Sequence, residues 1–382
     1  MQIYDELMAL CEDDQNLFYF KDQTTAMGMN VRIFNYHFVS YTDWLKPSAL
    51  ECRGIMFKMV DGVATEILTR PMSKFFNLCE NPFTTDLDMN EIEFFMDKAD
   101  GSLVSTYLDN GRVRMKSKAS IHSDQAIWAN QYIDDWSHEA LRFRVQELAE
   151  AGFTCNFEYV APHNRVVLGY QDTHMFLLNV RENESGNYVP YNELKSDPVL
   201  RKYLVPGYVV EDGTDPAKFV ESVYQMQGIE GYVFKMQSGL FFKVKTDWYS
   251  ELHNVKASLN NNKALMMLAR LGVLDDVRAL FSDEYSLTKI NTFEKVFLGF
   301  LMDSLKVIRE LHKKYHGLSR KDYAVGSQTE LTLLNKPYLF GLFMSLFNGM
   351  IVTEALVEAI SEVFTKNVDL FIPEEYRDPV KT

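Results

Sequence analysis

A lysine lies at the edge of an apolar run in FFMDKADGSLVSTYL, residues 94–108. Lys98 is followed by Asp100 and then by Gly101, which permits a close backbone approach that a Cβ would block. A free lysine has a pKa near 10.4, so only about one in a thousand is neutral at pH 7.4. A lysine nucleophile therefore needs desolvation or nearby cations to lower its pKa. The stretch marks Lys98 as a candidate nucleophile, although a lysine beside an ordinary Asp-Gly turn has the same pattern.

A pair of lysines marks a second segment, FFKVKTDW at 241–248. Because side chains alternate along a strand, Lys243 and Lys245 lie on one face, while Phe242 and Val244 lie on the other. Two neighbouring lysines repel each other unless an anion lies between them, and a polyphosphate would serve. The same pattern also occurs where lysines protect a solvated edge strand.

Cations alternate again in GRVRMKSK, residues 111–118. If this segment is a strand, one face carries Arg112, Arg114, Lys116 and Lys118. Such a line of cations suits a nucleic-acid backbone or a nucleotide phosphate. An exposed strand face is the other interpretation.

Charged side chains also interrupt apolar segments. They are Glu158 in CNFEYVAP, Glu230 in GIEGYVFKM, Arg53 in ECRGIMF and Lys74 in RPMSKFFN. A glutamate in an apolar strand pairs with a cation, binds a metal ion or accepts a hydrogen bond from a ligand hydroxyl. Arg53 can fork onto a carboxylate or a phosphate. Pairing inside the fold remains open for all of these residues.

Composition restricts the class of protein. The chain has 382 residues and a formal net charge of −14, which argues against a general nucleic-acid coat but not against a local basic groove. No apolar run is long enough to span a bilayer and the first residues do not resemble a signal peptide, so we expect no membrane partner and a cytoplasmic location. The four cysteines lack metal-ligand spacing, which favours reduced thiols.

The pattern of the chain changes near residue 255. Helical segments alternate before this point with strand-like runs, among them 31–39, 102–108, 165–169, 174–181 and 231–236. After it the segments have a helical period and almost no strand signals. We therefore expect an α+β domain with mixed or antiparallel sheets over residues 1–254, and an all-α domain over residues 255–382.

The motifs occur in a definite order: Lys-x-Asp-Gly, a glutamate in an apolar strand, Glu-Gly-Tyr-Val and Lys-x-Lys. This order resembles the covalent nucleotidyltransferases, which include DNA ligases, RNA ligases and mRNA capping enzymes. ALECRGIMF, RPMSKFFNLCENPF, NFEYVAPHNRVVL and LLNVRENESG narrow the resemblance to the T4 RNA ligase 1 family. It covers nearly the whole chain and is weakest at 200–228 and 256–345. Ala99 stands at a variable position of its motif, where a close relative has glutamate.

The resemblance implies an ATP-dependent RNA ligase. Lys98 would attack the α-phosphate of ATP and form a lysyl–AMP phosphoramide with release of pyrophosphate. The AMP would pass to the 5′-phosphate of an RNA end, and a 3′-hydroxyl would then displace it to seal a phosphodiester. The family further implies repair of a tRNA nicked in its anticodon loop, in cooperation with an end-healing polynucleotide kinase/phosphatase. If the chain is phage-encoded, the reaction would take place in the host-cell cytoplasm.

The resemblance also implies a nucleotide site. Lys243 and Lys245 would hold the phosphates and help to depress the pKa of Lys98, and Glu158 would complete the catalytic set by binding a ribose hydroxyl or supporting the metal. The implied ATP-binding residues are Tyr36, Arg53, Lys74, Phe76, Gly101, Lys118, Glu230, Lys243, Lys245 and Tyr249.

The implied metal ion is Mg²⁺. Glu230 would serve it, and Asp275 stands where the family has a metal-binding aspartate, although Asp276 is equally placed. A short list of protein ligands is expected, because Mg²⁺ keeps several waters and uses few carboxylates.

Two other functions remain open. A DNA ligase or capping-type nucleotidyltransferase would normally carry an OB-fold after the Lys-x-Lys strand, where this chain has a helical pattern. A non-catalytic RNA-binding module with a vestigial nucleotide pocket would have lost a charged motif residue, yet each one is present. The helical part also holds the basic stretch KVIRELHKKYHGLSRK, residues 306–321, which predicts contacts with RNA phosphates unless it is an ordinary solvated helix face.

Overall fold

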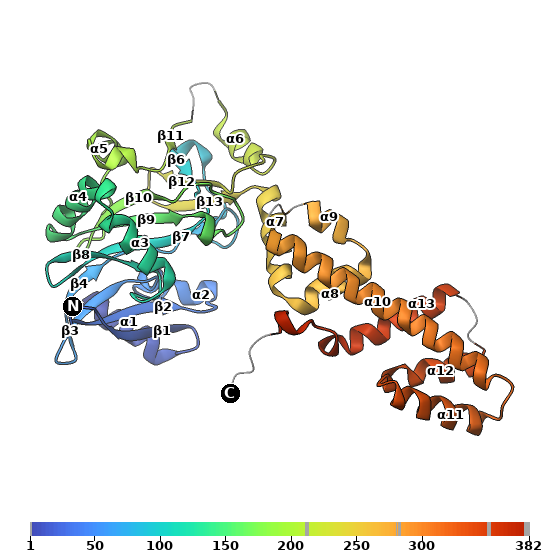
Figure 1. The fold of residues 1–382 in the computed structure, drawn as a ribbon. Helices are drawn as coiled ribbons and strands as arrows, with labels where there is room; N and C mark the ends of the chain where they lie inside the picture. The colour runs from blue at the N-terminus through green and yellow to red at the C-terminus, as the bar shows by residue number, and fades with distance from the viewer. Residues whose placement is uncertain (1, 211–213, 280, 282–283, 350–352, 378–382) are drawn as a thin grey trace. The chain divides into compact units, whose positions relative to one another are not determined.

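The computed structural model describes residues 2–210, 214–279, 281, 284–349 and 353–377. The chain divides into two compact units, Met1–Glu251 and Leu252–Thr382. Within the described residues, the first unit contains the strands and the second consists of helices and turns (Figure 1).

A four-stranded antiparallel sheet forms the N-terminal layer of the first unit. Its strands lie side by side in chain order: β1 (Phe18–Thr24), β2 (Asn30–Tyr36), β3 (Met56–Val60) and β4 (Val63–Thr69). Asp61 and Gly62 join β3 to β4 with φ angles of 51° and 81°, as a two-residue hairpin turn requires. Helix α1 (Gln2–Asp13) packs the buried side chain of Leu7 into the core of this layer.

Two further sheets complete the first unit. One has the order β10-β9-β7-β8 and comprises β7 (Ser102–Asp109), β8 (Arg112–Ser117), β9 (Phe153–Val160) and β10 (His174–Glu182). The other has the order β11-β6-β12-β13-β5 and comprises β5 (Phe76–Asn77), β6 (Ile92–Asp97), β11 (Gly207–Tyr208), β12 (Gly231–Met236) and β13 (Phe241–Lys245). All neighbours are antiparallel except β13 and β5, which are parallel. The prediction of an α+β fold with mixed and antiparallel sheets is therefore confirmed.

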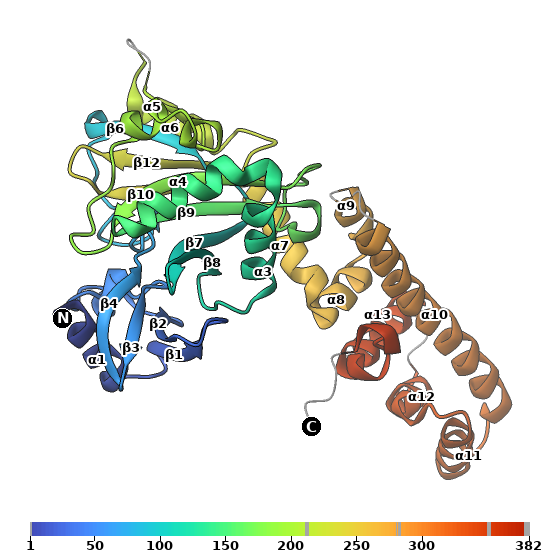
Figure 2. The same cartoon turned by 60° about the vertical axis from the view of Figure 1, so that its left-hand side comes forward.

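Two helices pack against the β10-β9-β7-β8 sheet (Figure 2). They are α3 (Asp124–Asp134) and α4 (Glu139–Glu150). The Ser123 side chain accepts a hydrogen bond from the Ala126 amide, as an N-cap does, and Gly152 follows the end of α4 with a φ of 83°. Shorter helices lie in the connections: α2 (Tyr41–Trp44), α5 (Tyr191–Ser196) and α6 (Pro216–Val223).

The strand predicted at residues 165–169 is wrong, because this segment follows a 3-10 turn and has no strand pairing. The amides of Val167 and Leu168 both donate to Asp100 Oδ2, at 2.7 and 2.6 Å. Successive amides of a strand point in opposite directions, so two that bind one oxygen atom are incompatible with a ladder. The apolar run predicted a strand, but the backbone here wraps around a buried carboxylate.

The described part of the second unit is helical. Its helices are α7 (Asp247–Asn260), which begins within the first unit, α8 (Asn262–Leu271), α9 (Leu274–Ala279), α10 (Glu284–Tyr315), α11 (Arg320–Leu333), α12 (Phe340–Phe347) and α13 (Thr353–Lys366). The long helix α10 buries Ile290, Phe293 and Ile308 in a core shared with Leu265 and Phe343. Among the described helices, none combines the length and apolarity that a membrane crossing needs.

Candidate active site

Lys98 directly follows β6, and its amide donates to the Gly231 carbonyl at 3.0 Å. The pairing of β6 with β12 therefore brings Lys98 beside Glu230, the residue before β12. Lys98 Nζ lies 2.7 Å from Glu230 Oε1, and Lys245 Nζ lies 3.1 Å from the same oxygen. Because the Glu230 side chain is only 3% exposed, it forms a buried anion shared by two lysines.

Strand β13 turns Lys243 and Lys245 to one face, and its alternate residues are buried. Burial lowers the pKa of Lys243 to about 7, and the neighbouring cations Lys74, Lys98 and Lys245 act in the same direction. A bound polyanion would counter this repulsion and favour the charged lysine.

A second group of cations surrounds Tyr36, the last residue of β2. Lys118 Nζ lies 4.8 Å and Lys74 Nζ 5.8 Å from the centre of the Tyr36 ring. Burial and the nearby Arg53 lower the pKa of Lys118. Burial also lowers the pKa of Lys74, with Arg53 and Lys118 adding to the shift and Glu80 opposing it. This group likewise favours an anionic ligand.

Phe75 joins the two groups of cations, and the sequence did not single it out. Its ring centre lies 5.7 Å from Arg53 Cζ and 5.7 Å from Lys243 Nζ. Arg53 Nη1 also donates to the Met72 carbonyl at 3.2 Å. One aromatic ring thus stands beside a cation of each group.

Glu158 contacts the segment that carries Lys98. Its Oε1 accepts from the Gly101 amide at 3.1 Å. Burial raises the pKa of Glu158 to about 7; Lys98 opposes this shift and Glu230 adds to it. Gly101 packs so closely that a Cβ there would lie 2.3 Å from the Tyr159 carbonyl oxygen. The glycine is therefore required for close packing rather than for an unusual φ angle.

Asp100 is the functional residue that sequence reasoning missed most clearly. It is 2% exposed, and besides the amides of Val167 and Leu168 its carboxylate accepts from the Tyr249 hydroxyl at 2.7 Å. Its own amide donates to the Tyr170 hydroxyl at 3.1 Å. The Lys-x-Asp-Gly pattern placed an aspartate two residues after Lys98, but it did not predict the distant partners that Asp100 binds.

A cavity of about 280 Å³ opens beside Lys98. Lys98 and Glu230 supply its polar side, and Leu168, Phe176 and Val205 are among its apolar lining. Its size and apolar walls suit a flat heterocycle next to the lysine amine.

The line of cations expected on residues 112–118 is not one surface. Arg112 and Arg114 form ion pairs with Asp134, and only Lys118 reaches the group around Tyr36. Lys116 is fully buried and donates to the Gly54 carbonyl at 2.7 Å; burial, with some contribution from Lys118, lowers its pKa to about 7. Alternation alone predicted one cationic face, but ion pairing of the two arginines and burial of Lys116 separate these residues.

Three other predicted site residues have different surroundings. Phe76 is 3% exposed and stacks on Phe83, and Tyr249 is 2% exposed, so a nucleotide contact by either ring stays a prediction. Asp275 lies in the second unit, where its exposed carboxylate pairs with Arg278, and the side chain of Asp276 is outside the described residues. Within the described part of the chain, no three His, Cys, Asp or Glu side chains cluster as metal ligands.

Two family models match this chain. The T4 RNA ligase 1 C-terminal domain matches residues 256–376, and the RNA ligase family model matches residues 51–249, about half of the chain. The chain belongs to the T4 RNA ligase 1 family. It is accordingly an ATP-dependent RNA ligase with a nucleotidyltransferase domain.

Two curated relatives and one solved structure are similar to this chain. A candidate RNA ligase of Thermovibrio ammonificans is 24% identical over 312 residues, which cover 80% of each chain. RNA ligase 1 of bacteriophage TS2126 is 30% identical over 211 residues, 53% of this chain and 51% of that protein. A structure of Naegleria gruberi RNA ligase with ATP and Mn has a TM-score of 0.31 and 16% identity, over 42% of this chain and 51% of that one. This chain therefore spans about half the length of the last two.

We expect the binding of α,β-methylene-ATP at pH 8 to take up protons. Lys243, with a pKa of about 7, is mostly neutral in the free protein at pH 8, and bound phosphates would restore its charge. Titration calorimetry in two buffers of different ionisation enthalpy measures this uptake. Lys243→Met should reduce it, whereas Lys218→Met, on the exposed side of α6, should not. If Lys243→Met takes up as many protons as the natural chain, the uptake belongs to another group.

Gly101→Ala should slow lysine adenylylation by at least about tenfold, because its methyl group would push the Lys98 segment away from Tyr159. A lower unfolding temperature should accompany the loss. The matched control is Gly299→Ala in helix α10, where a Cβ meets nothing within 4 Å. Adenylylation rates and thermal melts of both variants make the comparison, and a wild-type rate for Gly101→Ala would contradict the close packing.

Proposed function

We propose that this ligase joins 5′-phosphate and 3′-hydroxyl RNA ends through lysyl–AMP and RNA-adenylate intermediates, with Lys98 as the nucleophile. The observation that carries the proposal is a pair of amines on one carboxylate oxygen. Lys98 Nζ and Lys245 Nζ lie 2.7 and 3.1 Å from Glu230 Oε1, beside a cavity of about 280 Å³. Family membership supports the reaction class, and the geometry supports the assignment of the amine.

In the first step, the Lys98 nitrogen would bond to the α-phosphorus of ATP while the bond to the bridging oxygen breaks. Pyrophosphate would leave with that electron pair. The charged amine would give up two protons to water, and the phosphoramide nitrogen would keep the third. Lys98 Nζ lies 2.7 Å from Glu230 Oε1 in the free protein, so the amine would leave this contact to reach the α-phosphorus. Lys243 and Lys245 would disfavour a further positive charge beside them and would bind the phosphates, while the cavity would hold the adenine.

The tail of the triphosphate would extend toward the second group of cations. Arg53, Lys74 and Lys118 have the charge for this task, and Phe75 bridges them to Lys243. Burial, together with neighbouring cations, lowers the pKa of Lys74 and of Lys118, which supports an anionic ligand beside them. Tyr36 would pack against the nucleotide, and Glu158 would accept a hydrogen bond from a ribose hydroxyl.

We propose Mg²⁺ as the metal ion. Glu230 fits an oxygen ligand for it, with Glu158 as a further candidate, and such a short list fits an ion that keeps most of its waters. The metal-binding role of Asp275, in the second unit, stays a separate prediction. When bound, the ion would neutralise part of the phosphate charge.

We further propose a tRNA nicked in its anticodon loop as the substrate, a cytoplasmic location, and cooperation with a kinase/phosphatase that heals the ends. A curated viral relative supports the last point: a candidate bifunctional polynucleotide kinase/RNA ligase of Autographa californica nuclear polyhedrosis virus is 25% identical over 263 residues. The basic stretch 306–321 would position the RNA through its phosphates.

The alternatives fit less well. A DNA ligase or capping enzyme would normally continue into an OB-fold, whereas the described residues after β13 are helical. A non-catalytic RNA-binding module has no need for two lysines on one buried carboxylate with a third, Lys243, close to both, since crowded cations cost stability.

Incubation with ATP and Mg²⁺ should add one AMP to the protein through an acid-labile bond at Lys98. Lys98→Ala should abolish this adduct, yet it should still seal a pre-adenylylated RNA, because the last step does not use the amine. Intact-mass and peptide-mapping mass spectrometry measure the adduct, and a gel assay measures sealing. Lys21→Ala, an exposed lysine of β1, is the control. A covalent AMP on Lys98→Ala would refute the assignment.

The basic stretch gives a second test of the proposed function. The full chain with Lys306→Ala, Lys313→Ala and Lys321→Ala should seal a nicked tRNA several-fold more slowly, and the salt dependence of RNA binding should weaken by about one unit of slope per lost contact. A short unstructured RNA should be less affected. The control variant replaces three other exposed lysines, Lys21, Lys195 and Lys218, by alanine and therefore loses the same charge. Equal losses with both RNAs would remove a role in substrate selection.

A further inference from the structure

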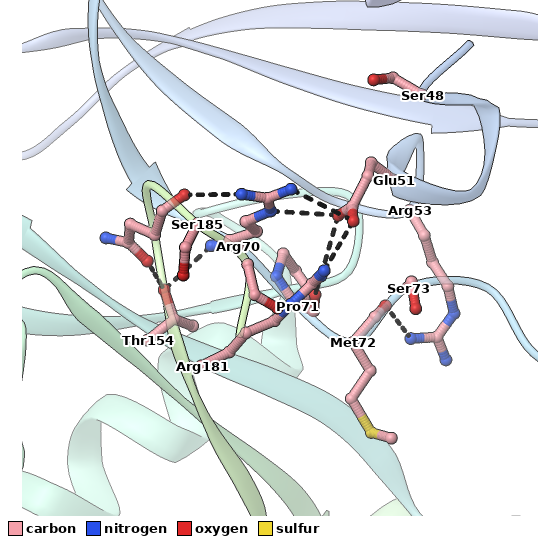
Figure 3. Close-up of polar contacts among 12 residues, drawn as sticks. Ser48, Glu51, Arg53, Arg70, Pro71, Met72, Ser73, Thr154, Arg181 and Ser185 are labelled. Carbon is pink, nitrogen blue, oxygen red and sulfur yellow. Dashed lines mark hydrogen bonds and ion pairs between the residues drawn. The ribbon is translucent and has the colours of Figure 1, made fainter. Parts of the chain in front are cut away.

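Two arginines converge on Glu51, outside the residues assigned to ATP (Figure 3). Arg181 donates to both Glu51 oxygens, at 2.8 and 2.6 Å, and Arg70 donates to both at 3.3 Å. The three residues, called here the Glu51 cluster, are well buried: their side chains are 15% exposed for Glu51, 10% for Arg70 and 5% for Arg181. Burial alone would raise the pKa of Glu51, but Arg181 and Arg70 lower it.

The arginines of the Glu51 cluster also bind the backbone. Arg181 donates to the carbonyls of Pro71 and Gly186, and Arg70 to those of Asn183 and Glu184, all between 2.6 and 3.0 Å. Gly186 lies so close that a Cβ would stand 2.6 Å from Arg70 Cζ and 2.9 Å from Arg181 Nη2. The loop after β10 thus covers the pair of guanidinium groups, and the cluster has one fixed arrangement.

Both segments that meet in the Glu51 cluster lead into the proposed ATP site. Glu51 ends a 3-10 turn (Ala49–Glu51) two residues before Arg53, and Arg70 begins the stretch that reaches Lys74. The Lys74 amide donates to the Leu50 carbonyl at 2.7 Å, and Arg53 Nη1 donates to the Met72 carbonyl at 3.2 Å. The two segments are therefore tied together on both sides of the cluster.

A purely stabilising function does not require this arrangement. Replacing a buried group of ion pairs by apolar residues of similar volume is often neutral or favourable for stability. What such residues cannot do is hold two chain segments in one register through directed hydrogen bonds. Here those segments carry two cations that would meet the same triphosphate.

We propose that Glu51 is a positioning residue for ATP, which acts by holding Arg53 and Lys74 at the spacing that the phosphates need. This inference rests on the proposed function, because it takes Arg53 and Lys74 as phosphate ligands. Both Glu51 oxygens are taken up by Arg70 and Arg181, so its effect on ATP would pass through Arg53 and Lys74.

The test is a double-mutant cycle read as the dissociation constant of α,β-methylene-ATP, which needs no covalent step at Lys98. Glu51→Gln keeps the shape of the side chain but removes its charge and places an amide donor before a guanidinium group. It should weaken binding at least about tenfold in the natural chain, but less than about twofold when Arg53→Ala and Lys74→Ala are already present. A tenfold loss in both backgrounds, or no loss in the natural chain, would overturn the proposal.

Two further variants separate positioning from folding. Gly186→Ala would displace the guanidinium groups without changing Glu51, Arg53 or Lys74, and it should weaken binding of the analogue in the same manner. Replacement of the whole cluster by Glu51→Met, Arg70→Met and Arg181→Met leaves no uncompensated charge and should keep a cooperative thermal melt. If this folded variant binds the analogue as the natural chain does, the cluster has no positioning role. Failure of the natural chain to form lysyl–AMP would instead count against the proposed function, since analogue binding is measured independently.

Discussion

One buried carboxylate controls the arrangement of the first unit. The Glu230 side chain is almost fully buried, and it contacts the amines of Lys98 and Lys245. Lys98 directly follows β6 and Lys245 ends β13, the two strands that flank β12. An anion in such a place is stable only if its partners stay close, so β6, β12 and β13 must pair in the observed register. The register that pairs these charges also places the proposed nucleophile beside the proposed phosphate ligands Lys243 and Lys245.

The other charged residues of the site are positioned by buried polar residues that do not line the cavity. Asp100 fixes the turn that bounds the cavity, Glu51 fixes the segments with Arg53 and Lys74, and buried Lys116 binds the carbonyl next to Arg53. Each of these residues contacts the backbone or another charged side chain rather than facing the cavity. The cations that face a ligand can therefore remain poorly compensated, because other groups supply the rigidity.

Sequence reasoning recovered what depends on local pattern and order. Alternation predicted the shared face of Lys243 and Lys245, and the helical period after residue 255 predicted the helical second unit. It failed where the partner is distant. The turn at 165–169 exists because of Asp100, and Lys116 left the expected surface because of Gly54. Apolar runs and alternating charges do not encode contacts between distant residues. The Glu51 cluster and the position of Phe75 between two groups of cations are therefore visible only in the structure.

The sheet β11-β6-β12-β13-β5 combines strands from widely separated parts of the chain. During synthesis, Lys98 leaves the ribosome long before the glutamate and lysines that surround it in the folded protein. Under the proposed function, Lys98 would not react with ATP until β12 and β13 have emerged and paired with β6, because Glu230, Lys243 and Lys245 are not beside it before then. The nascent chain would therefore become active toward ATP only after translation has passed Lys245 and the central strands have paired.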